Sequence, residues 1–482
     1  MASGSLPASL QLNTTTGTIS GTPTASGSSN FTVRATGANS LSATQALTLT
    51  IMPSGLVFSG VAPTRVCDTR PASVSGITDA CTGHRLAGGV PLVVNLPPFT
   101  VPSGAGAVVA NVTVTGPASP GYLSVYPTGA NAPASSNLNF TTGQTVANLV
   151  TVATGSAAGA ASITVVMGTV TPGADVVIDV EGFDAAPVST AGGFHPLTPA
   201  RDADTRCALN PSAPACASEG IPAINQAAST LGANGQDRIQ VTGVNGVPST
   251  GVAAVAVNLT AVFPTASGYL TVAPGGTIPP GGPSSSSLNF TAGEVLANKV
   301  IVPVASDGTI SVYNYAGLTD AVVDIDGWYS SAGGPPGATF TPVAPVRLAD
   351  TRCGSSPVPS FCAGENLPGV NASDRPPSGG QSIAVGVGGT GTVPNTVDAA
   401  VLDVVDVIPD ASNFLTVYPA GAGIPATSDV NWSPNDAYNV VPGASYAATS
   451  TGGAVDIQNG PTQPATTDIV VDLFGYYTPP SG

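Results

Sequence analysis

One six-residue pattern, R-x-x-D-T-R, occurs three times in this chain and strongly constrains how it can fold. The copies are Arg65–Arg70, Arg201–Arg206 and Arg347–Arg352. They take six of only 11 Lys+Arg residues in a chain of 482. A chain that places so many of its few cations at one repeated position uses them to hold its architecture together or to form a site. The pattern says more about how the molecule is built than about what it does.

Each copy opens a segment of roughly 140 residues that closes on a second shared pattern. The closings are Asp175–Phe183, Asp320–Trp328 and Asp468–Tyr476, each with two aspartates four apart and a Gly–aromatic pair. Solenoid and propeller repeats have shorter periods of about 20–50 residues. A unit of this length can bury its own core. The sequence therefore predicts three independent domains in tandem, like beads.

Short apolar runs rich in Val, Ile and Thr indicate an all-β fold. They are broken about every 8–12 residues by Gly, Pro, Ser or Asn, a spacing typical of β-sandwiches and barrels. In one run, Val108, Ala110, Val112 and Val114 would share a single face of a strand. Stretches long enough for an amphipathic helix are scarce. We expect a partial Ig-like module followed by three homologous β-sandwich-type repeats. The predicted domains are residues 1–53, 56–187, 192–333 and 338–480.

The six cysteines are divided two per repeat, all close to the R-x-x-D-T-R pattern. One local disulfide per repeat is the economical connectivity. Metal binding is a poorer explanation, because the cysteine spacings are not those of zinc fingers and no histidine lies at ligand spacing. Disulfides place the chain outside the cytoplasm. The predicted pairs are Cys67–Cys81, Cys207–Cys216 and Cys353–Cys362.

The repeated arginines and aspartates would meet if the opening and closing segments pair as neighbouring strands. Arginine forms a planar, bidentate clamp on a carboxylate. We favour a structural ion pair that locks the first and last strands of each domain. The alternative is an anion or carboxylate site used three times. The predicted cluster contains Arg65, Asp68, Arg70, Asp179 (or Asp175), Arg201, Asp204, Arg206, Asp324, Arg347, Asp350, Arg352 and Asp472.

Charge and missing motifs argue against several classes of function. The net charge of −16 disfavours binding to nucleic acid and to anionic membranes, and no apolar stretch is long enough for membrane insertion. His84 and His195 stand at non-equivalent places, and no catalytic or phosphate-binding motif is present. We predict no enzyme activity and no catalytic residue. No cofactor or metal is expected, with Ca²⁺ as the alternative that an acidic surface protein suggests.

Three unusual residues also favour structural roles. Trp328 and Trp432 stand where other copies carry core-type aromatics, so we expect both in the core rather than in an exposed sugar-binding platform. Lys299 is the single lysine. It excludes a lysine isopeptide bond as a stabiliser shared by all repeats, because the sequence alignment places Leu149 and Val440 at that position.

The first fifty residues contain L-P-A-S-L-Q-L-N-T-T-T-G-T-I-S-G-T-P-T. This resembles the C-terminal half of the bacterial "putative Ig" domains, β-sandwiches that are strung along secreted and surface-attached proteins. The early strands of that domain are missing and no signal peptide follows Met1, so we expect a truncated copy within a fragment of a longer protein. The matching positions are Leu12, Asn13, Gly17, Ile19, Gly21, Thr22 and Pro23.

Residues 58–479 are similar to a repeat that is common in secreted and cell-wall proteins of actinobacteria and their relatives. The similarity rests on R-x-x-D-T-R, G-Y-L-[ST]-V, [NS]-L-N-F and V-x-D-x-x-G-[YW], and departs at Asp403, where the other copies have Asn111 and Asn258. It implies a non-catalytic extracellular structural, adhesion or display scaffold. The alternatives are a multivalent glycan- or polymer-binding array and a secreted hydrolase. A cell-wall glycan or another surface protein is the expected partner, while the ligand and oligomeric state stay open.

Overall fold

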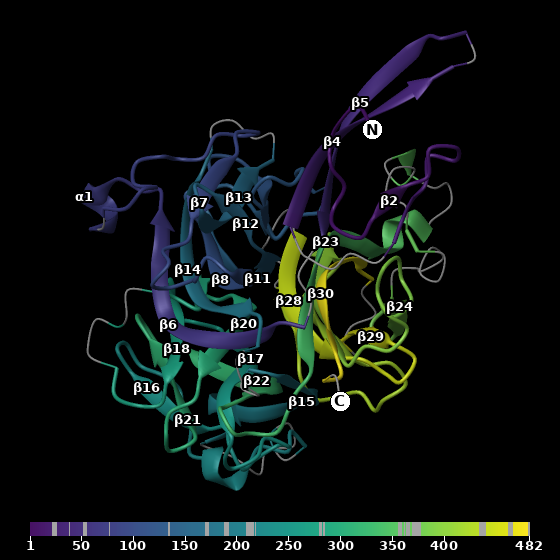
Figure 1. Ribbon diagram of the computed structural model, residues 1–482. Coiled ribbons are helices and arrows are strands. Elements are labelled where there is room, and N and C mark those ends of the chain that lie inside the picture. The colour runs from purple at the N-terminus through teal and green to yellow at the C-terminus, as the bar shows by residue number, and fades with distance from the viewer. Residues whose placement is uncertain are drawn as a thin grey trace. The chain divides into compact units, whose positions relative to one another are not determined.

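The chain divides into two compact units, Met1–Ser54 and Gly55–Gly482, in the computed structural model (Figure 1). Residue 53 and the motif residues Thr22 and Pro23 lie outside the described residues. The structure describes residues 1–21, 27–37, 39–51, 55–76, 78–133, 135–168, 173–187, 192–208, 216, 218–278, 282, 285–354, 359–360, 362, 367–368, 377–432, 440–460 and 466–480.

The first unit contains a small antiparallel sheet of order β1-β4-β5 and a short hairpin, β2-β3. The hairpin turn follows from the L-N-x-x-T-G pattern, because the Asn13 side chain accepts hydrogen bonds from the backbone N–H groups of Thr15 and Thr16. Gly17 completes the turn at a φ of +76°. The strands are β1 (Ser3–Gly4), β2 (Gln11–Leu12), β3 (Ile19–Ser20), β4 (Gly27–Thr36) and β5 (Ser42–Ile51).

In the second unit, each repeat is a sandwich of two antiparallel sheets. The first repeat has β6 (Val57–Asp68), β7 (Leu92–Asn95), β8 (Ala105–Thr115), β9 (Gly121–Pro127), β10 (Leu138–Phe140), β11 (Thr145–Ala153), β12 (Gly155–Ala157), β13 (Ala160–Met167) and β14 (Asp175–Ala185). The second has β15 (Phe194–Asp204), β16 (Gln236–Gln240), β17 (Val252–Val262), β18 (Gly268–Pro274), β19 (Leu288–Phe290), β20 (Val295–Pro303), β21 (Thr309–Asn314) and β22 (Asp320–Ser330). The third has β23 (Thr339–Asp350), β24 (Ser382–Gly386), β25 (Ala399–Val407), β26 (Asn413–Pro419), β27 (Val430–Trp432), β28 (Val440–Ala448), β29 (Ala454–Asn459) and β30 (Asp468–Thr478).

The helices among the described residues are single short turns. They are α1 (Ala72–Ser75), η1 (Thr205–Cys207), η2 (Ala223–Asn225) and η3 (Thr351–Gly354). None of the helices in the described part of the chain has the length and apolar character needed to cross a membrane.

The strand order within each sandwich is the same in all three repeats, apart from an additional strand, β12, in the first. One sheet runs β11-β8-β14-β6, β20-β17-β22-β15 and β28-β25-β30-β23 in the three repeats respectively. The opening strand of every repeat therefore lies beside its closing strand, as β6 beside β14, β15 beside β22 and β23 beside β30. We call the sheet that contains the opening and closing strands the inner sheet of its repeat. The outer sheets run β10-β9-β13-β12, with β7 beside β13, and then β19-β18-β21-β16 and β27-β26-β29-β24.

The inner sheets are buried on both faces. Val108, Ala110, Val112 and Val114 of β8 share one face and pack in the sandwich core, as their alternation predicts. The opposite face is also buried, because Val109 belongs to a separate central cluster that includes residues of all three repeats. Strands that are buried on both faces have nearly continuous apolar sequences.

The central cluster contradicts the expectation of three separate beads. Its core is a set of aromatic rings in tilted contact, with Phe58 4.5 Å from Tyr329, Phe194 4.6 Å from Tyr477, and Phe340 5.0 Å from Tyr477 between ring centroids. Each repeat buries its inner sheet against the other two, so residues 55–482 fold as one compact body. In Figure 1 these repeats follow one another from blue through green to yellow.

Contacts between the repeats close into a ring. Asn111 of the first repeat donates to the Ser286 carbonyl of the second at 2.6 Å. Asn258 of the second donates to the Ser428 carbonyl of the third. Asn148 of the first then donates to Asp403 of the third at 3.1 Å. Strands β11, β20 and β28 also contact one another across the centre.

The glycine of every closing pattern makes room for a phenylalanine of the opening strand. A Cβ at Gly182 would lie 2.3 Å from the Phe58 ring, and Gly327 and Gly475 meet Phe194 and Phe340 in the same way. This close approach explains why the Gly–aromatic pair recurs. These three phenylalanines each stand seven residues before the first arginine of R-x-x-D-T-R.

Candidate functional site

The first arginine of each R-x-x-D-T-R pattern clamps the second aspartate of the closing pattern. Arg65 donates to both carboxylate oxygens of Asp179, from Nε and Nη2, at 2.8 Å each. The pairing register of β6 and β14 sets these two residues directly opposite each other. The equivalent pairs are Arg201 with Asp324 and Arg347 with Asp472.

The second arginine binds the aspartate of its own pattern. Arg70 contacts Asp68 through Nε at 2.9 Å and Nη2 at 2.6 Å, and the Arg70 backbone N–H donates to the same carboxylate. Asp68 also lies 3.4 Å from Arg65, which links the two pairs. The other repeats hold Arg206 on Asp204 and Arg352 on Asp350 in the same manner. The structure thus brings together all the residues of the predicted ion-pair cluster.

Sequence reasoning missed the threonine of R-x-x-D-T-R. Thr69 is buried, donates to Asp175 at 3.1 Å, and accepts the Val176 backbone N–H at 2.8 Å. Asp175, which was the alternative partner for the clamp, therefore binds Thr69 and Arg85 instead. Thr205 and Thr351 make the equivalent contacts.

In the first two repeats, the aspartate of R-x-x-D-T-R and the second aspartate of the closing pattern differ electrostatically. Burial raises the pKa of Asp179 above its ordinary value, although Arg65 opposes the shift. Burial also disfavours ionisation of Asp68, but hydrogen bonds and charge from Arg70 outweigh it and lower the pKa. The pKa values of Asp324 and Asp472 are raised by burial like that of Asp179, and hydrogen bonds and charge from Arg206 lower the pKa of Asp204 like that of Asp68. The cluster therefore keeps one carboxylate strongly ionised and encloses the other.

Three disulfides join the cysteine pairs expected from the sequence. They link Cys67 to Cys81, Cys207 to Cys216 and Cys353 to Cys362. The first cysteine of each pair lies in or directly after R-x-x-D-T-R. Each disulfide therefore fastens the loop that follows the clamp.

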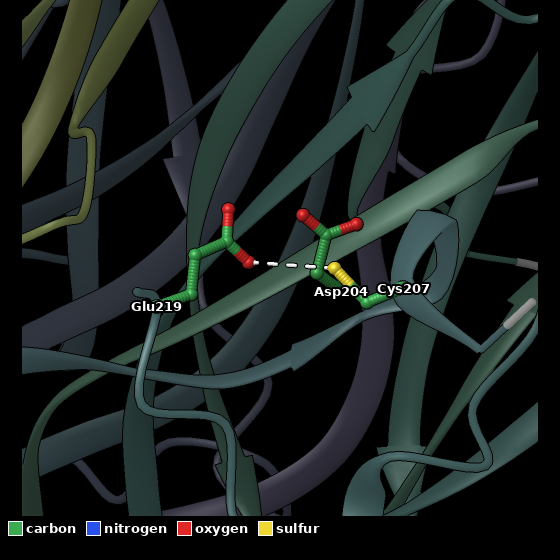
Figure 2. A group of neighbouring side chains, drawn as sticks. All are labelled: Asp204, Cys207 and Glu219. Atoms are coloured by element: carbon green, nitrogen blue, oxygen red, sulfur yellow. Dashed lines mark hydrogen bonds between the residues drawn. The ribbon is translucent and has the colours of Figure 1, made fainter. Parts of the chain in front are cut away.

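One group of side chains has the proximity of a metal site but not its chemistry. Asp204, Cys207 and Glu219 lie close enough to share an ion, and Figure 2 shows the Cys207 sulfur facing the Glu219 carboxylate. That sulfur is bonded to Cys216, so it is not a thiolate ligand. Glu219 is paired with Arg201 at 2.7 Å. The donor set does not fit a metal.

Like-placed grooves lie at two junctions between repeats. The first, of about 630 Å³, lies between the first two repeats and is lined by Arg65, Arg70, Tyr269, Tyr315 and Asn289 among others. The second, of about 910 Å³, lies between the second and third repeats. Its lining includes Arg201, Arg206, Phe414 and Asn431, which occupy the corresponding sequence positions. The clamp arginines thus form one wall of each groove, and a G-Y-L-type strand of the next repeat forms the other.

The remaining candidate residues fall outside these grooves. Trp328 and Trp432 are buried, in agreement with a core role. Trp328 stacks on His195 with 3.7 Å between ring centroids. His84 is exposed. The two histidines therefore share no site.

Several buried carboxyl groups were not predicted as site residues from the sequence. Glu181, Asp184 and Asp326 lie on the inner sheets and face neighbouring repeats or the central cluster, where charged residues are rarely buried. Burial raises the pKa of Glu181 and of Asp184 to about 8. The repeat comparison could have singled them out, because Phe474 occupies the position of Glu181 in the third copy, and Tyr329 and Tyr477 occupy the position of Asp184 in the other copies.

Comparison with known proteins identifies the first unit only. The family model named Putative Ig domain (He_PIG) matches residues 1–52. No curated protein matches the chain. A chain from the solved structure "Life in the extremes: atomic structure of Sulfolobus Turreted Icosahedral Virus" is similar at 8% identity, with 88% of this chain and 92% of that chain covered. Its TM-score is 0.15, so it carries no argument about fold or function.

The fold and the family match define a class of protein. The chain is an all-β protein of antiparallel sheets with an Ig-like start and three disulfides. Ig-like modules of this kind are typical of non-catalytic surface and structural proteins, and disulfides are typical of extracellular ones.

Proposed function

We propose that the protein is a non-catalytic extracellular scaffold of a bacterial surface or secreted protein, and that residues 55–482 form a durable display or adhesion module. The observation that carries this proposal is the central cluster shared by the three repeats. Three repeats of one chain around a shared core resist local opening, because no repeat can unfold without exposing the inner sheets of the other two. The similarity of the repeats to those of actinobacterial cell-wall proteins fits this setting.

Two further features support durability. The clamps tie the first strand of each repeat to its last strand, and a disulfide fastens the adjoining loop. The sites where trypsin cuts are also few, and Arg65, Arg201 and Lys299 among them have side chains that are at most 12% exposed. A folded module of this kind should survive in a protease-rich medium.

Limited proteolysis and calorimetry test the scaffold proposal. We expect trypsin to leave residues 55–482 as one large fragment under native conditions, and calorimetry to show one cooperative transition for that fragment. Rapid native cleavage after Arg65 or Arg201, or three separated transitions, would remove the proposal. The shared core also means that residues 55–482, rather than a single repeat, are the smallest part to test.

The like-placed grooves favour a second candidate, a multivalent glycan- or polymer-binding array. Each groove sets guanidinium donors and an asparagine beside an aromatic ring, the combination that binds saccharide hydroxyls and ring faces. In the first groove the Tyr269 and Tyr315 rings stack at 4.6 Å, and Tyr315 is 45% exposed. Two grooves on one compact unit would add avidity for a repeating polymer.

A glycan and cell-wall polymer screen on the full chain tests this second candidate. Tyr269→Ala and Phe414→Ala each remove an aromatic ring that lines one groove, so each should weaken binding and the double variant should weaken it further. Phe99→Ala, at a side chain that is 87% exposed and outside both grooves, is the matched control. Absence of binding across the screen, or binding that all variants retain, would leave only the scaffold.

The third candidate, a secreted hydrolase, receives less support from these grooves. Neither lining includes a histidine, and the carboxylates in the second lining, Asp204 and Glu219, are paired with arginine. A paired-carboxylate mechanism needs carboxyl groups that can reach a substrate.

A further inference from the structure

The single lysine of the chain is buried between two carboxyl groups from different repeats. The Lys299 side chain on β20 has no exposed surface, and its Nζ lies 2.7 Å from Asp326 Oδ2 on β22 and 3.1 Å from Asp429 Oδ1, just before β27. Asp326 belongs to the second repeat and Asp429 to the third. Lysine is almost never fully buried in proteins without a specific partner.

The sequence of the repeats shows that this triad is not part of the common architecture. Strand pairing places Lys299 opposite Asn258, Leu149 opposite Asn111, and Ala444 opposite Asp403. Ala444, and not Val440 as the sequence alignment suggested, is therefore the third equivalent of the lysine. The fold accepts an apolar residue at this position in the other two repeats.

Asp429 also differs from the residues at the equivalent position in the other two repeats. Asn137 in the first repeat and Ser287 in the second accept the backbone N–H of Val125 and Val272, and Asp429 Oδ2 accepts that of Val417 at 2.8 Å. An amide or a hydroxyl fulfils this role equally well. The chain places a carboxyl group at this position only where the facing strand of the neighbouring repeat carries the lysine.

The two carboxyl groups are held differently. Asp429 receives the Val417 N–H on Oδ2 and the Ser445 hydroxyl on Oδ1, at 3.0 Å for the latter. These donors fix its orientation and withdraw electrons from its carbonyl carbon. Burial raises the pKa of Asp326 to about 7, although Lys299 opposes the shift. Asp326 is therefore suited to take up and release a proton near neutral pH.

We propose that Lys299 and Asp429 react to form an intramolecular isopeptide bond that joins the second and third repeats, with Asp326 as the proton-transfer residue. The required groups are a primary amine, a carboxyl group and a proton carrier in a water-excluded site, and all three are in place. The bond would connect residues 130 positions apart.

The reaction is a condensation that needs no other reactant. It proceeds from the arrangement of the neutral triad in which Lys299 is an ammonium ion and the single proton that the two carboxyl groups share is on Asp429 Oδ1. Lys299 passes a proton to Asp326, and the free amine attacks the Asp429 carbonyl carbon while the Val417 N–H stabilises the charge on Oδ2. The carbon–nitrogen bond forms and the bond to Oδ1 breaks. Asp326 gives its proton to the departing hydroxyl, which leaves as water, and takes one from the nitrogen.

The test is the intact mass of the full chain after its disulfides have been reduced. The proposal expects a mass lower than that of the sequence by one water molecule, and a digest in which the peptides that contain Lys299 and Asp429 are joined. Lys299→Arg and Asp429→Ala should each have the full mass expected for their sequences. Asp326→Asn should leave the bond unformed, with both reacting groups still present. A wild-type chain with the full mass would overturn the proposal.

Two comparisons keep the mass measurement specific. Glu181→Gln changes the residue that corresponds to Asp326 in the first repeat, where Leu149 replaces the lysine, and should keep the lower mass. An Asp–Gly sequence can also lose water by forming a succinimide, and the chain has two such sequences, Asp307–Gly308 and Asp326–Gly327. A Lys299→Arg chain that keeps the lower mass would assign the lost water to a succinimide and overturn the isopeptide bond.

Discussion

The pH dependence of stability at Asp184 measures the free-energy cost of burying a carboxyl group at the centre of the three repeats. Its carboxyl group is buried, and both oxygens lack a hydrogen-bond partner among the described residues. Burial raises the pKa of Asp184 to about 8, whereas an aspartate in an unfolded chain titrates near ~3.9. Between these values the unfolded chain has released the proton and the folded chain has kept it. The folded state therefore loses about 1.4 kcal/mol of stability for each unit that the pH rises.

Asp184→Asn removes this titration while it keeps the shape of the side chain. Urea unfolding of wild type and variant at pH 5, 6 and 7 should show that the stability of the variant relative to wild type rises by about 3 kcal/mol over that range. Other buried carboxyl groups titrate in both proteins and cancel in the difference. Asp307→Asn, at an exposed aspartate paired with Arg238, should leave the wild-type pH dependence in place. An Asp184→Asn difference that is the same at pH 5 and pH 7 would refute the reasoning.

Three further changes test the clamp, the ring and the disulfides. Arg65→Ala leaves Asp179 buried without its partner and should lower the free energy of unfolding by about 3–5 kcal/mol in a denaturation assay. The control is Arg85→Ala, at a side chain that is 43% exposed, which should lower it by less than about 1 kcal/mol. Asp403→Asn restores the residue of the other two repeats; because burial raises the pKa of Asp403 well above its ordinary value, the variant should gain about 1–3 kcal/mol at pH 7 and less at pH 5. A melting temperature unchanged at pH 7 would contradict this gain. Replacing Cys67 and Cys81 by alanine opens a loop with a separation of 14 residues and should lower stability by about 3 kcal/mol, which calorimetry of the double variant would show.

The sequence alone predicts much of the local architecture. The alternation around Val108 predicts the strand and its core face, and the cysteine positions predict the three disulfides. The paired opening and closing patterns predict which strands neighbour each other. These features are local or repeated, so their signal survives in a single sequence.

The association of the repeats was not predicted, for physical reasons. Phe58, Phe194 and Phe340 recur at one position, but a repeated aromatic residue serves equally well in a separate core. Asn111 lies on the strand face that the alternation assigns to solvent, and a neighbouring repeat covers that face instead. The wrong assignment of Val440 as the third equivalent of Lys299 has a related cause. The pairing of β25 with β28 sets the strand register and places Ala444 there, and the sequence alone does not show this register.

The ring is built from three copies of one fold in a single polypeptide, and this has a consequence for symmetry. A homotrimer must repeat any substitution three times around its axis, and it dissociates on dilution. In this chain the copies vary independently, so one central position holds Asp184 in the first repeat and Tyr329 and Tyr477 in the others. Covalent linkage thus frees the assembly from mass action and lets each copy specialise at its junctions while the framework stays constant.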